Sequence, residues 1–298
     1  MAVAGGLIKG GLGEAVAVGA EVIQFFAGNP RSWIPRNFDP AADDAFHAAL
    51  DDLGLEAYVH APHLINLGSS APLVVERSFA ALTAALRHAS RLGATGVVFH
   101  AGSSVVPDRR RAALAQLHEL MPRLLDTGPP GVRLLVEPTA GGAAALASTI
   151  ESTVEYLDAV ADDRLGLCLD TCHLHAAGED LSTPGAVQQW VKILGDSVGL
   201  HRLHLIHMND SRDPPGAKRD RHESLGKGTL GTAGLAALLS LPELRGVSFL
   251  AETPTHAEDV AMLRSWRRDA ENVSTAPASD ETFDVEVGDD EQRIATAE

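Results

Sequence analysis

The stretch that decides the fold is residues 165–178, LGLCLDTCHLHAAG. It opens with an apolar run, residues 165–169, which has the length of a buried strand and is broken only by Gly166. The run ends on Asp170, and His173 follows three residues later. A carboxylate and an imidazole at the end of a buried strand are two good zinc ligands. Taken alone, D-x-x-H is better explained by an Asp that caps the next turn and a His that packs in a loop, because the motif matches many unrelated chains.

The same arrangement, an apolar run that ends in His, Asp or Glu, recurs along the chain. Runs with strand character are residues 22–26, 55–60, 96–100, 132–137, 165–170, 203–207 and 247–252. Six of these runs end on His60, His100, Glu137, Asp170, His207 and Glu252. Helix patterns alternate with them at residues 39–53, 73–92, 108–125, 145–160, 184–194, 229–239 and then up to about residue 268. This alternation predicts parallel strands joined by crossover helices.

A barrel explains the strand ends better than an open sheet does. In an open doubly wound sheet, only a few strand ends meet at one crevice. In a (β/α)₈ barrel, the carboxyl ends of all strands converge on one mouth. We therefore predict an α/β fold, a (β/α)₈ TIM barrel, of which this sequence holds seven strands.

Composition places the chain among globular proteins. With 298 residues and 45% hydrophobic content, it can bury a sizeable core. It has no apolar run of roughly 18 residues, so we expect no membrane association; we also expect no secretory signal. The two cysteines, Cys168 and Cys172, argue against a disulfide scaffold and fit a reducing cytoplasm. We expect a cytoplasmic monomer with two small buried thiols.

The charge of −16 argues at first against a nucleic-acid partner. Residues 269–298 hold ten acidic residues and one Arg, however, so the rest of the chain is only moderately acidic. Carboxylates that bind divalent metal reverse the local charge, and DNA binding therefore stays open. We predict a barrel domain, residues 1–268, and an acidic tail without fixed structure, residues 269–298.

Nine side chains are candidate metal ligands. They are His60, His100, Glu137, Asp170, His173, His207, Asp220, His222 and Glu252. One tetrahedral zinc takes about four ligands, so nine suffice for two or three ions if a carboxylate bridges. Any one of them alone is as well explained by capping or packing. Six strands that all end in such a residue would require six independent coincidences. Neighbouring zinc ions suit phosphodiester hydrolysis, because one lowers the pKa of a bound water while another stabilises the leaving oxygen.

Longer motifs extend this pattern. The stretches are NPRSW (29–33), INLGS (65–69), VFHAGS (98–103), VEPTAG (136–141), CLDTCHLHAAGEDL (168–181), HMNDS (207–211), DRHESLGKGTLG (220–231) and AETP (251–254). Because these stretches occur in this order along the chain, the chain resembles the endonuclease IV family, the zinc-dependent apurinic/apyrimidinic endonucleases. D-T-C-H and D-R-H-x-S-L-G-x-G are long and specific motifs, whereas NPRSW and INLG alone would be weak.

The resemblance implies a xylose-isomerase-like barrel with three zinc ions per chain, manganese being an alternative at one site. The implied ligand sets are His60 and His100 with Glu137 for the first ion, Glu137 with Asp170, His207 and Glu252 for the second, and His173, Asp220 and His222 for the third.

The implied reaction is hydrolysis of the phosphodiester 5′ to an abasic site in double-stranded DNA, leaving a 3′-hydroxyl and a 5′-deoxyribose phosphate. Glu137 and Glu252 would be the catalytic residues: Glu137 would bridge the ion pair that carries the attacking hydroxide, and Glu252 would position or deprotonate it. Enzymes of this family flip the abasic nucleotide out of the duplex.

Three residues are expected to contact DNA. Arg31 and Trp33 belong to a loop that resembles the family's DNA-penetrating loop, and His63 stands where the family has a bulky aromatic residue after the first His ligand. An exposed Arg beside a Trp that covers the barrel rim explains Arg31 and Trp33 equally well.

The family pattern has a strand before A-G-G-L, and Met1 falls almost at that point, so we expect a start codon placed too late. Two other functions stay open. One is a metal-dependent sugar isomerase or epimerase on the same barrel, which uses fewer histidines and has no need of the D-R-H segment. The other is a non-catalytic protein that binds damaged DNA.

Overall fold

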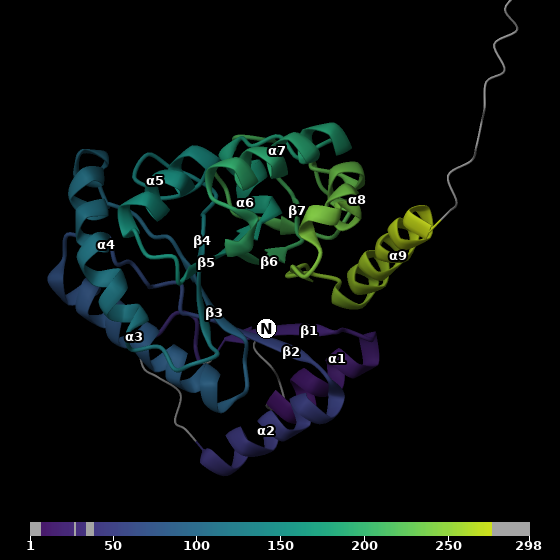
Figure 1. The fold of residues 1–298 in the computed structure, drawn as a ribbon, viewed down its shortest axis with the longest axis horizontal. Coiled ribbons are helices and arrows are strands. Elements are labelled where there is room, and N and C mark those ends of the chain that lie inside the picture. Colours follow the sequence, from purple (N-terminus) through teal and green to yellow (C-terminus); the bar gives the residue numbers. More distant parts are fainter. Residues whose placement is uncertain (1–6, 27, 34–38, 276–298) are drawn as a thin grey trace, which may run out of the picture.

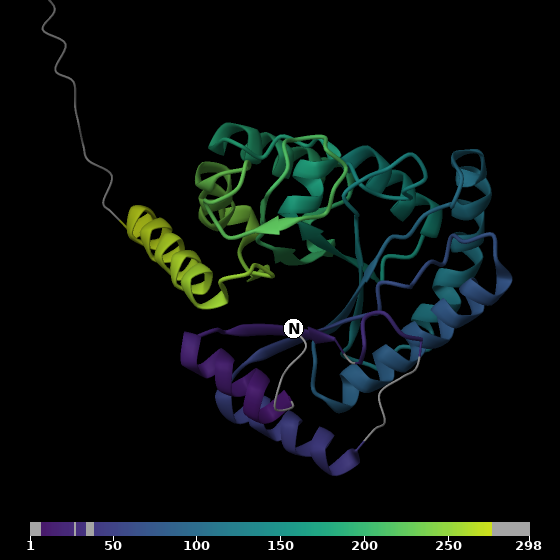
Figure 2. The same ribbon diagram turned by 180° about the vertical axis from the view of Figure 1, so that it is seen from behind.

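Seven parallel strands form one curled sheet in this computed structural model, which describes residues 7–26, 28–33 and 39–275. Neighbouring strands follow the order β1-β2-β3-β4-β5-β6-β9, and the helices lie outside the curl (Figure 1, Figure 2). The strands are β1 (Val22–Phe26), β2 (Glu56–His60), β3 (Gly96–His100), β4 (Arg133–Glu137), β5 (Leu165–Asp170), β6 (Leu203–His207) and β9 (Ser248–Leu250). The predicted TIM-barrel architecture with seven strands is confirmed.

The α-helices alternate with the strands along the chain, as predicted, except that two helices follow β5. The α-helices are α1 (Gly13–Val18), α2 (Pro40–Leu53), α3 (Pro72–Arg91), α4 (Arg110–Leu125), α5 (Ile150–Val160), α6 (Thr171–Ala177), α7 (Pro184–Ser197), α8 (Thr232–Ser240) and α9 (His256–Thr275). Shorter elements are a π-helical turn (Leu7–Leu12), 3₁₀ turns (Pro107–Arg109, Leu200–Arg202 and Pro242–Leu244) and a ribbon of β7 (Asp210–Ser211) with β8 (His222–Glu223). None of the helices in the described part of the chain is long and apolar enough to cross a bilayer.

Strand alternation divides the apolar side chains into two clusters. The larger cluster lies between the sheet and the helices, where for example the rings of Phe25 and Phe46 meet edge-on at 5.4 Å. The smaller cluster fills the barrel interior and consists of Tyr58, Val98, Leu135, Cys168, Leu205 and Leu250, with Val22 packed against it. Since successive residues of a strand point to opposite faces, the residue two positions after each of these also points inward.

The barrel is open between β1 and β9. No strand pairing joins these two elements among the described residues, although each pairs with its other neighbour. A cavity of 1520 Å³ lies between them, bordered by α1, α8 and α9, and it extends inward to His60, Glu137 and Glu252. The open side therefore leads directly to the carboxyl ends of the strands.

Several boundaries differ from the sequence prediction. The helix predicted from residue 145 begins at Ile150, because Thr149 and Ser152 form a reciprocal capping box there. The last helix continues beyond residue 268 to Thr275. The last strand ends at Leu250, so Glu252 lies just past it rather than on it. The division into a barrel and an acidic tail stays a prediction, and residues 276–298 lie outside the described residues.

Two elements were not anticipated. No helix was predicted for residues 171–177, which form α6; Asp170 caps this helix by accepting a hydrogen bond from the backbone nitrogen of His173 at 3.0 Å. The polar segment after β6 contains the β7–β8 ribbon, which places His222 on a strand.

The close approach of α8 to the rest of the barrel gives a stability prediction. A Cβ atom at Gly234 would lie 1.6 Å from the backbone oxygen of Leu181. In a helix, alanine is more stabilising than glycine by about 1 kcal/mol. Overpacking against a backbone atom lowers the stability by about 1–3 kcal/mol or more. We expect Gly234→Ala to lower the free energy of unfolding, measured by urea titration with circular dichroism.

The matched control is Gly185→Ala in α7, where a Cβ atom would meet nothing within 4 Å. It should leave the stability unchanged or raise it slightly. Equal urea midpoints for the two variants would contradict the close packing of α8.

Candidate metal centre

Strand geometry brings six predicted ligands to one mouth of the barrel. Each residue of the inner apolar cluster is followed two positions later by one of them: His60, His100, Glu137, Asp170, His207 and Glu252. The inward apolar layer and the ligand layer are thus consecutive layers of one barrel. α6 contributes His173, and the segment that holds the β7–β8 ribbon contributes Asp220 and His222. The structure places all nine predicted ligands together.

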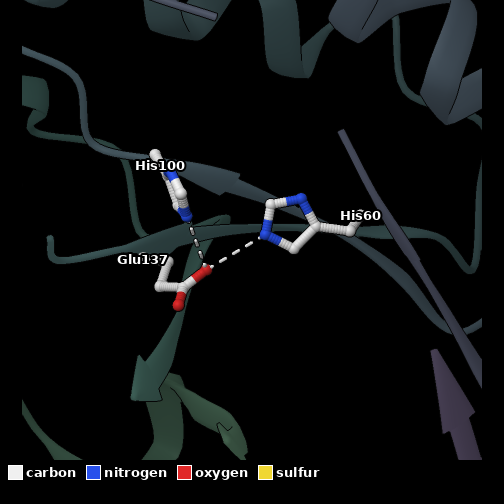
Figure 3. A group of neighbouring side chains, drawn as sticks. All are labelled: His60, His100 and Glu137. Carbon is white, nitrogen blue, oxygen red and sulfur yellow. Dashed lines mark hydrogen bonds and ion pairs between the residues drawn. The ribbon is translucent and has the colours of Figure 1, made fainter. Parts of the chain in front are cut away.

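The first group surrounds one oxygen of Glu137. Its Oε2 atom lies 3.3 Å from His60 Nε2 and 3.6 Å from His100 Nε2 (Figure 3). Figure 3 shows both imidazoles turned toward this oxygen from two neighbouring strands. These three residues are one of the groups whose ligand atoms all lie within 4.8 Å of one another.

The second group surrounds the other oxygen of Glu137. His207 Nδ1 lies 3.2 Å from Glu137 Oε1 and 3.2 Å from Glu252 Oε2. Asp170 Oδ2 is more distant from this nitrogen, at 3.9 Å. Glu137 therefore faces both groups, one with each carboxylate oxygen, which is the geometry of a bridging ligand.

The third group lies beside the second, on α6 and the segment of the β7–β8 ribbon. His173 Nε2 is 3.2 Å from Asp220 Oδ2, and His222 Nε2 is 3.1 Å from Asp220 Oδ1. The same His222 nitrogen is 3.3 Å from Asp170 Oδ2. Asp170 thus faces the third group while its other oxygen caps α6, so that the capping and ligand interpretations of this residue are both compatible with its position.

The donors fit zinc. Two atoms bound at about 2.0–2.1 Å to one tetrahedral zinc lie roughly 3.3 Å apart, close to most separations within the three groups. Among the described residues, His222 Nε2 is a buried nitrogen without a hydrogen bond, although two carboxylate oxygens lie within 3.3 Å. A nitrogen that is near acceptors but not aligned with them fits a metal-ligand atom better than a hydrogen-bond donor. Imidazoles and carboxylates are also the ligands that zinc takes in proteins.

Backbone carbonyls fix which histidine nitrogen faces the centre. His60 Nδ1 is 2.7 Å from the oxygen of Ala61, and His173 Nδ1 is 3.0 Å from that of Pro138. His222 Nδ1 is 3.2 Å from the oxygen of Glu252. A carbonyl oxygen only accepts, so each of these Nδ1 atoms carries the proton and donates it. The Nε2 atoms remain free to bind a metal, as expected for metal-binding histidines.

Charge balance keeps the buried carboxylates ionised. Burial raises the pKa of Glu137, but the charge of His207 and hydrogen bonds from the surrounding histidines outweigh it and hold that pKa well below its usual range. Burial likewise lowers the pKa of His222, while the carboxylates of Asp170 and Asp220 outweigh this effect and raise it to about 12. His100 is the exception, because burial lowers its pKa to about 3. Without metal, protons on several histidines balance the acidic groups.

A buried carboxylate next to the site holds its ribbon segment in place. Asp210 accepts hydrogen bonds from the backbone nitrogens of Ser211 (2.8 Å), Gly226 (3.0 Å), Gly228 (3.1 Å), Leu230 (3.0 Å) and Gly231 (3.3 Å). These bonds fix both ends of the segment that carries Asp220 and His222. Sequence reasoning missed this role, although the residue lies in the HMNDS motif.

The neighbouring Asn209 positions two ligands. Its amide nitrogen donates to Asp170 Oδ2 at 2.7 Å, and its amide oxygen accepts from the backbone nitrogen of Glu252 at 2.8 Å. Asn209 was also missed. The signals in the sequence were its place in the HMNDS motif and a polar side chain two residues after a strand that ends in histidine.

Of the predicted DNA-contacting residues, His63 lies at the mouth, and its backbone nitrogen donates a hydrogen bond to the oxygen of Pro30, next to Arg31, at 3.0 Å. Arg31 is exposed, and Trp33 is half-buried and packs against the outer core. The contact of Trp33 fits the interpretation of a side chain that covers the rim. The exposed His63 ring lies 5.4 Å from the ring of His60 and 5.3 Å from that of His100.

Both cysteines are buried and free, as expected, and they form no disulfide. Cys168 Sγ lies 3.6 Å from His207 Nε2, and burial raises the pKa of this thiol to about 12. It is therefore a neutral thiol beside the second group at neutral pH.

The role of Asp210 in holding the ribbon segment can be tested with the substitution Asp210→Asn. The amide would present N–H donors to backbone N–H groups, and hydrogen bonds to a charged acceptor contribute about 1.5–3 kcal/mol each. We expect a loss of at least about 2 kcal/mol of unfolding free energy and weaker binding of metal by His173, Asp220 and His222. Urea titration and zinc titration measure the two effects. The exposed Asp108→Asn is the control, and equal behaviour of the two variants would contradict the role of Asp210.

Metal binding should release protons. In the metal-free protein His173, His207 and His222 have raised pKa values and are protonated at neutral pH. A metal binds the unprotonated nitrogen, so the apparent zinc affinity should rise with pH. Calorimetric zinc titrations in buffers of different ionisation enthalpy measure the protons released. A binding enthalpy that is independent of the buffer would contradict this charge arrangement.

Known proteins share this architecture. The family described as a xylose isomerase-like TIM barrel matches residues 12–273. The chain is 44% identical over 272 residues to the probable endonuclease 4 of Streptomyces avermitilis, covering 89% of this chain and 88% of that protein. It is 38% identical over 269 residues to endonuclease 4 of Thermus thermophilus, covering 88% and 94%.

Solved structures with the same fold also match this chain. The crystal structure of an endonuclease IV from Thermus thermophilus matches with a TM-score of 0.75 and 36% identity, covering 90% of this chain and 97% of that one. A D-tagatose 3-epimerase-like protein matches with a TM-score of 0.69 at 17% identity, covering 89% and 93%, which is a likeness of fold alone.

Proposed function

Because this chain belongs to the endonuclease IV family, we propose that it is a DNA-repair endonuclease that hydrolyses the phosphodiester 5′ to an abasic site in double-stranded DNA. The products are a 3′-hydroxyl and a 5′-deoxyribose phosphate. The observation that carries the proposal is the pair of oxygens of Glu137, one facing His60 and His100 and the other facing His207. A carboxylate in this position is suited to bridge two ions.

The nine side chains are proposed to hold three zinc ions, with manganese as an alternative at one site. His60 and His100 with Glu137 would hold the first. Glu137, Asp170, His207 and Glu252 would hold the second, and His173, Asp220 and His222 the third. When bound, the ions would lower the pKa of a water and offset the charge that develops on the leaving oxygen.

The chain's own residues then have separate roles. Glu137 fixes the spacing of the first two groups. Glu252 lies just past the end of β9, and its side chain is 25% exposed, so that it can reach a water at the mouth and position or deprotonate it. Asp220 is 49% exposed and lies on the solvent side of the third group, where the leaving 3′-oxygen of the DNA would approach.

An abasic nucleotide suits such a recessed site. Taking a nucleotide out of the duplex costs least where the base is already missing. Arg31 and His63, which are both exposed, and the half-buried Trp33 are proposed to contact the DNA around the extruded nucleotide. We propose that the enzyme acts as a monomer.

A sugar isomerase or epimerase is the second candidate, because such proteins share the fold. The third group favours the nuclease. One ligand atom each of His173, Asp220 and His222 lie within 4.8 Å of one another, so these residues can hold an ion in addition to the one or two that a sugar isomerase would use. Metal analysis separates the two candidates. The nine proposed ligands, with Glu137 shared between two ions, predict about three zinc ions per chain for the nuclease, and a lower content would favour the isomerase.

The activity is tested on a DNA duplex that contains a single tetrahydrofuran abasic analogue. We expect a nick on its 5′ side that EDTA prevents and zinc restores. Glu137→Ala should reduce the rate by more than about 100-fold, because even residues that only orient metal ligands contribute 10–100-fold. The control is Glu76→Ala, an exposed acidic residue of α3, which should cut at the parent rate. Binding of the duplex without cleavage would contradict the enzyme and support a non-catalytic damage-binding protein.

A further inference from the structure

A glutamine inside the barrel lies against the second group of metal ligands. Gln24 is the central residue of β1, an otherwise apolar strand, and it lies two positions after Val22, which packs against the inner apolar cluster. Its side chain therefore points into the barrel, whereas its neighbour Phe25 packs outward against α2. A polar amide in this layer requires hydrogen-bond partners.

Both partners of Gln24 are predicted metal ligands. Gln24 Nε2 is 2.7 Å from Glu252 Oε1, and Gln24 Oε1 is 3.1 Å from His207 Nε2. An ionised carboxylate only accepts hydrogen bonds, so the atom facing Glu252 must be the amide nitrogen. The amide oxygen then faces His207, and an amide oxygen only accepts. His207 Nε2 must therefore carry a proton and donate it to Gln24.

This orientation determines the role of His207. With the proton on Nε2, the lone pair of a neutral imidazole is on Nδ1, which lies 3.2 Å from both Glu137 Oε1 and Glu252 Oε2. The other neighbour of Nε2, the Cys168 thiol, is more distant at 3.6 Å and is a weak hydrogen-bonding group. His60, His173 and His222 are oriented by backbone carbonyls, and His207 is oriented by this amide instead.

The position of Gln24 gives the contact a second effect. β1 and β9 face each other across the open side of the barrel without strand pairing among the described residues, and Glu252 follows the end of β9. The hydrogen bond from Gln24 to Glu252 joins residues 228 positions apart across this opening. Because Glu252 lies past the paired residues of β9, this side-chain hydrogen bond helps to fix the position of its carboxylate.

We propose that Gln24 is a positioning residue of the metal centre, which selects the metal-binding nitrogen of His207 and orients the carboxylate of Glu252 across the open side of the barrel. The proposal rests on the metal centre of the proposed function. It does not require any particular DNA substrate, and its test needs no DNA.

The test compares metal binding by the full chain and by Gln24→Met, which keeps a similar volume and removes both hydrogen bonds. Metal-free protein is titrated with zinc against a chelating indicator, and with Co²⁺ while the visible absorption of the bound ion is recorded. Loss of an orienting partner typically weakens metal binding 10–100-fold. We expect at least a tenfold loss at one site, and a changed absorption for the Co²⁺ ion bound there. The control is Ile23→Val, the adjacent residue on the opposite face of β1, which should match the parent in both titrations.

A second variant keeps the test informative if Gln24→Met fails to fold. Gln24→Glu has the same shape and still offers an acceptor to His207, but it loses the donor to Glu252. In proton NMR spectra of the zinc-loaded protein, the exchangeable Nε2 proton of His207 should be present in the parent and in Gln24→Glu. Where Gln24→Met folds, this resonance should be absent from its spectrum.

The proposal is overturned if Gln24→Met binds zinc within threefold of the parent with the same Co²⁺ absorption, or if Gln24→Glu loses the Nε2 proton resonance. These outcomes differ from failure of the proposed function, in which the parent itself binds no metal, or binds metal and does not cut the abasic duplex.

Discussion

The buried carboxylate of Glu137 is the group on which the rest of the site depends. An ionised carboxylate inside a protein is costly unless charged or hydrogen-bonding groups surround it. Here its two oxygens face nitrogens of His60, His100, His173 and His207 at 3.2–3.6 Å. Because each of these histidines comes from a different element, satisfying this single carboxylate requires that β2, β3 and β6 end, and α6 begins, at the same place.

The barrel makes this convergence possible through a simple repeat. One inward residue of each strand packs in the apolar layer, and the residue two positions later reaches the mouth. Leu135 and Glu137, or Leu205 and His207, are such pairs. Apolar burial below thus fixes the position of the polar layer above. Because a metal ion held by this layer binds the folded chain and not the unfolded one, we expect metal binding to contribute directly to the stability of the fold.

The strands and the meeting of the six strand-end candidates at one mouth could be predicted from the sequence, because a buried strand that ends in a histidine or an acid is a local pattern. The roles of Asn209, Asp210 and Gln24 could not, because each depends on a partner distant in the chain. Asp210 follows a strand as many capping acids do, and only the folded structure shows five backbone nitrogens around it. Helix α6 was missed because its seven residues are too few to show a periodic pattern.

The metal centre itself is tested most directly by X-ray diffraction from crystals grown with zinc, with data collected on both sides of the zinc absorption edge. Three anomalous peaks are expected at the barrel mouth, one between His60, His100 and Glu137, one between Glu137 and His207, and one between His173, Asp220 and His222. An anomalous map with no peak at Glu137, or with zinc bound only away from the strand ends, would contradict a metal centre built from these nine side chains.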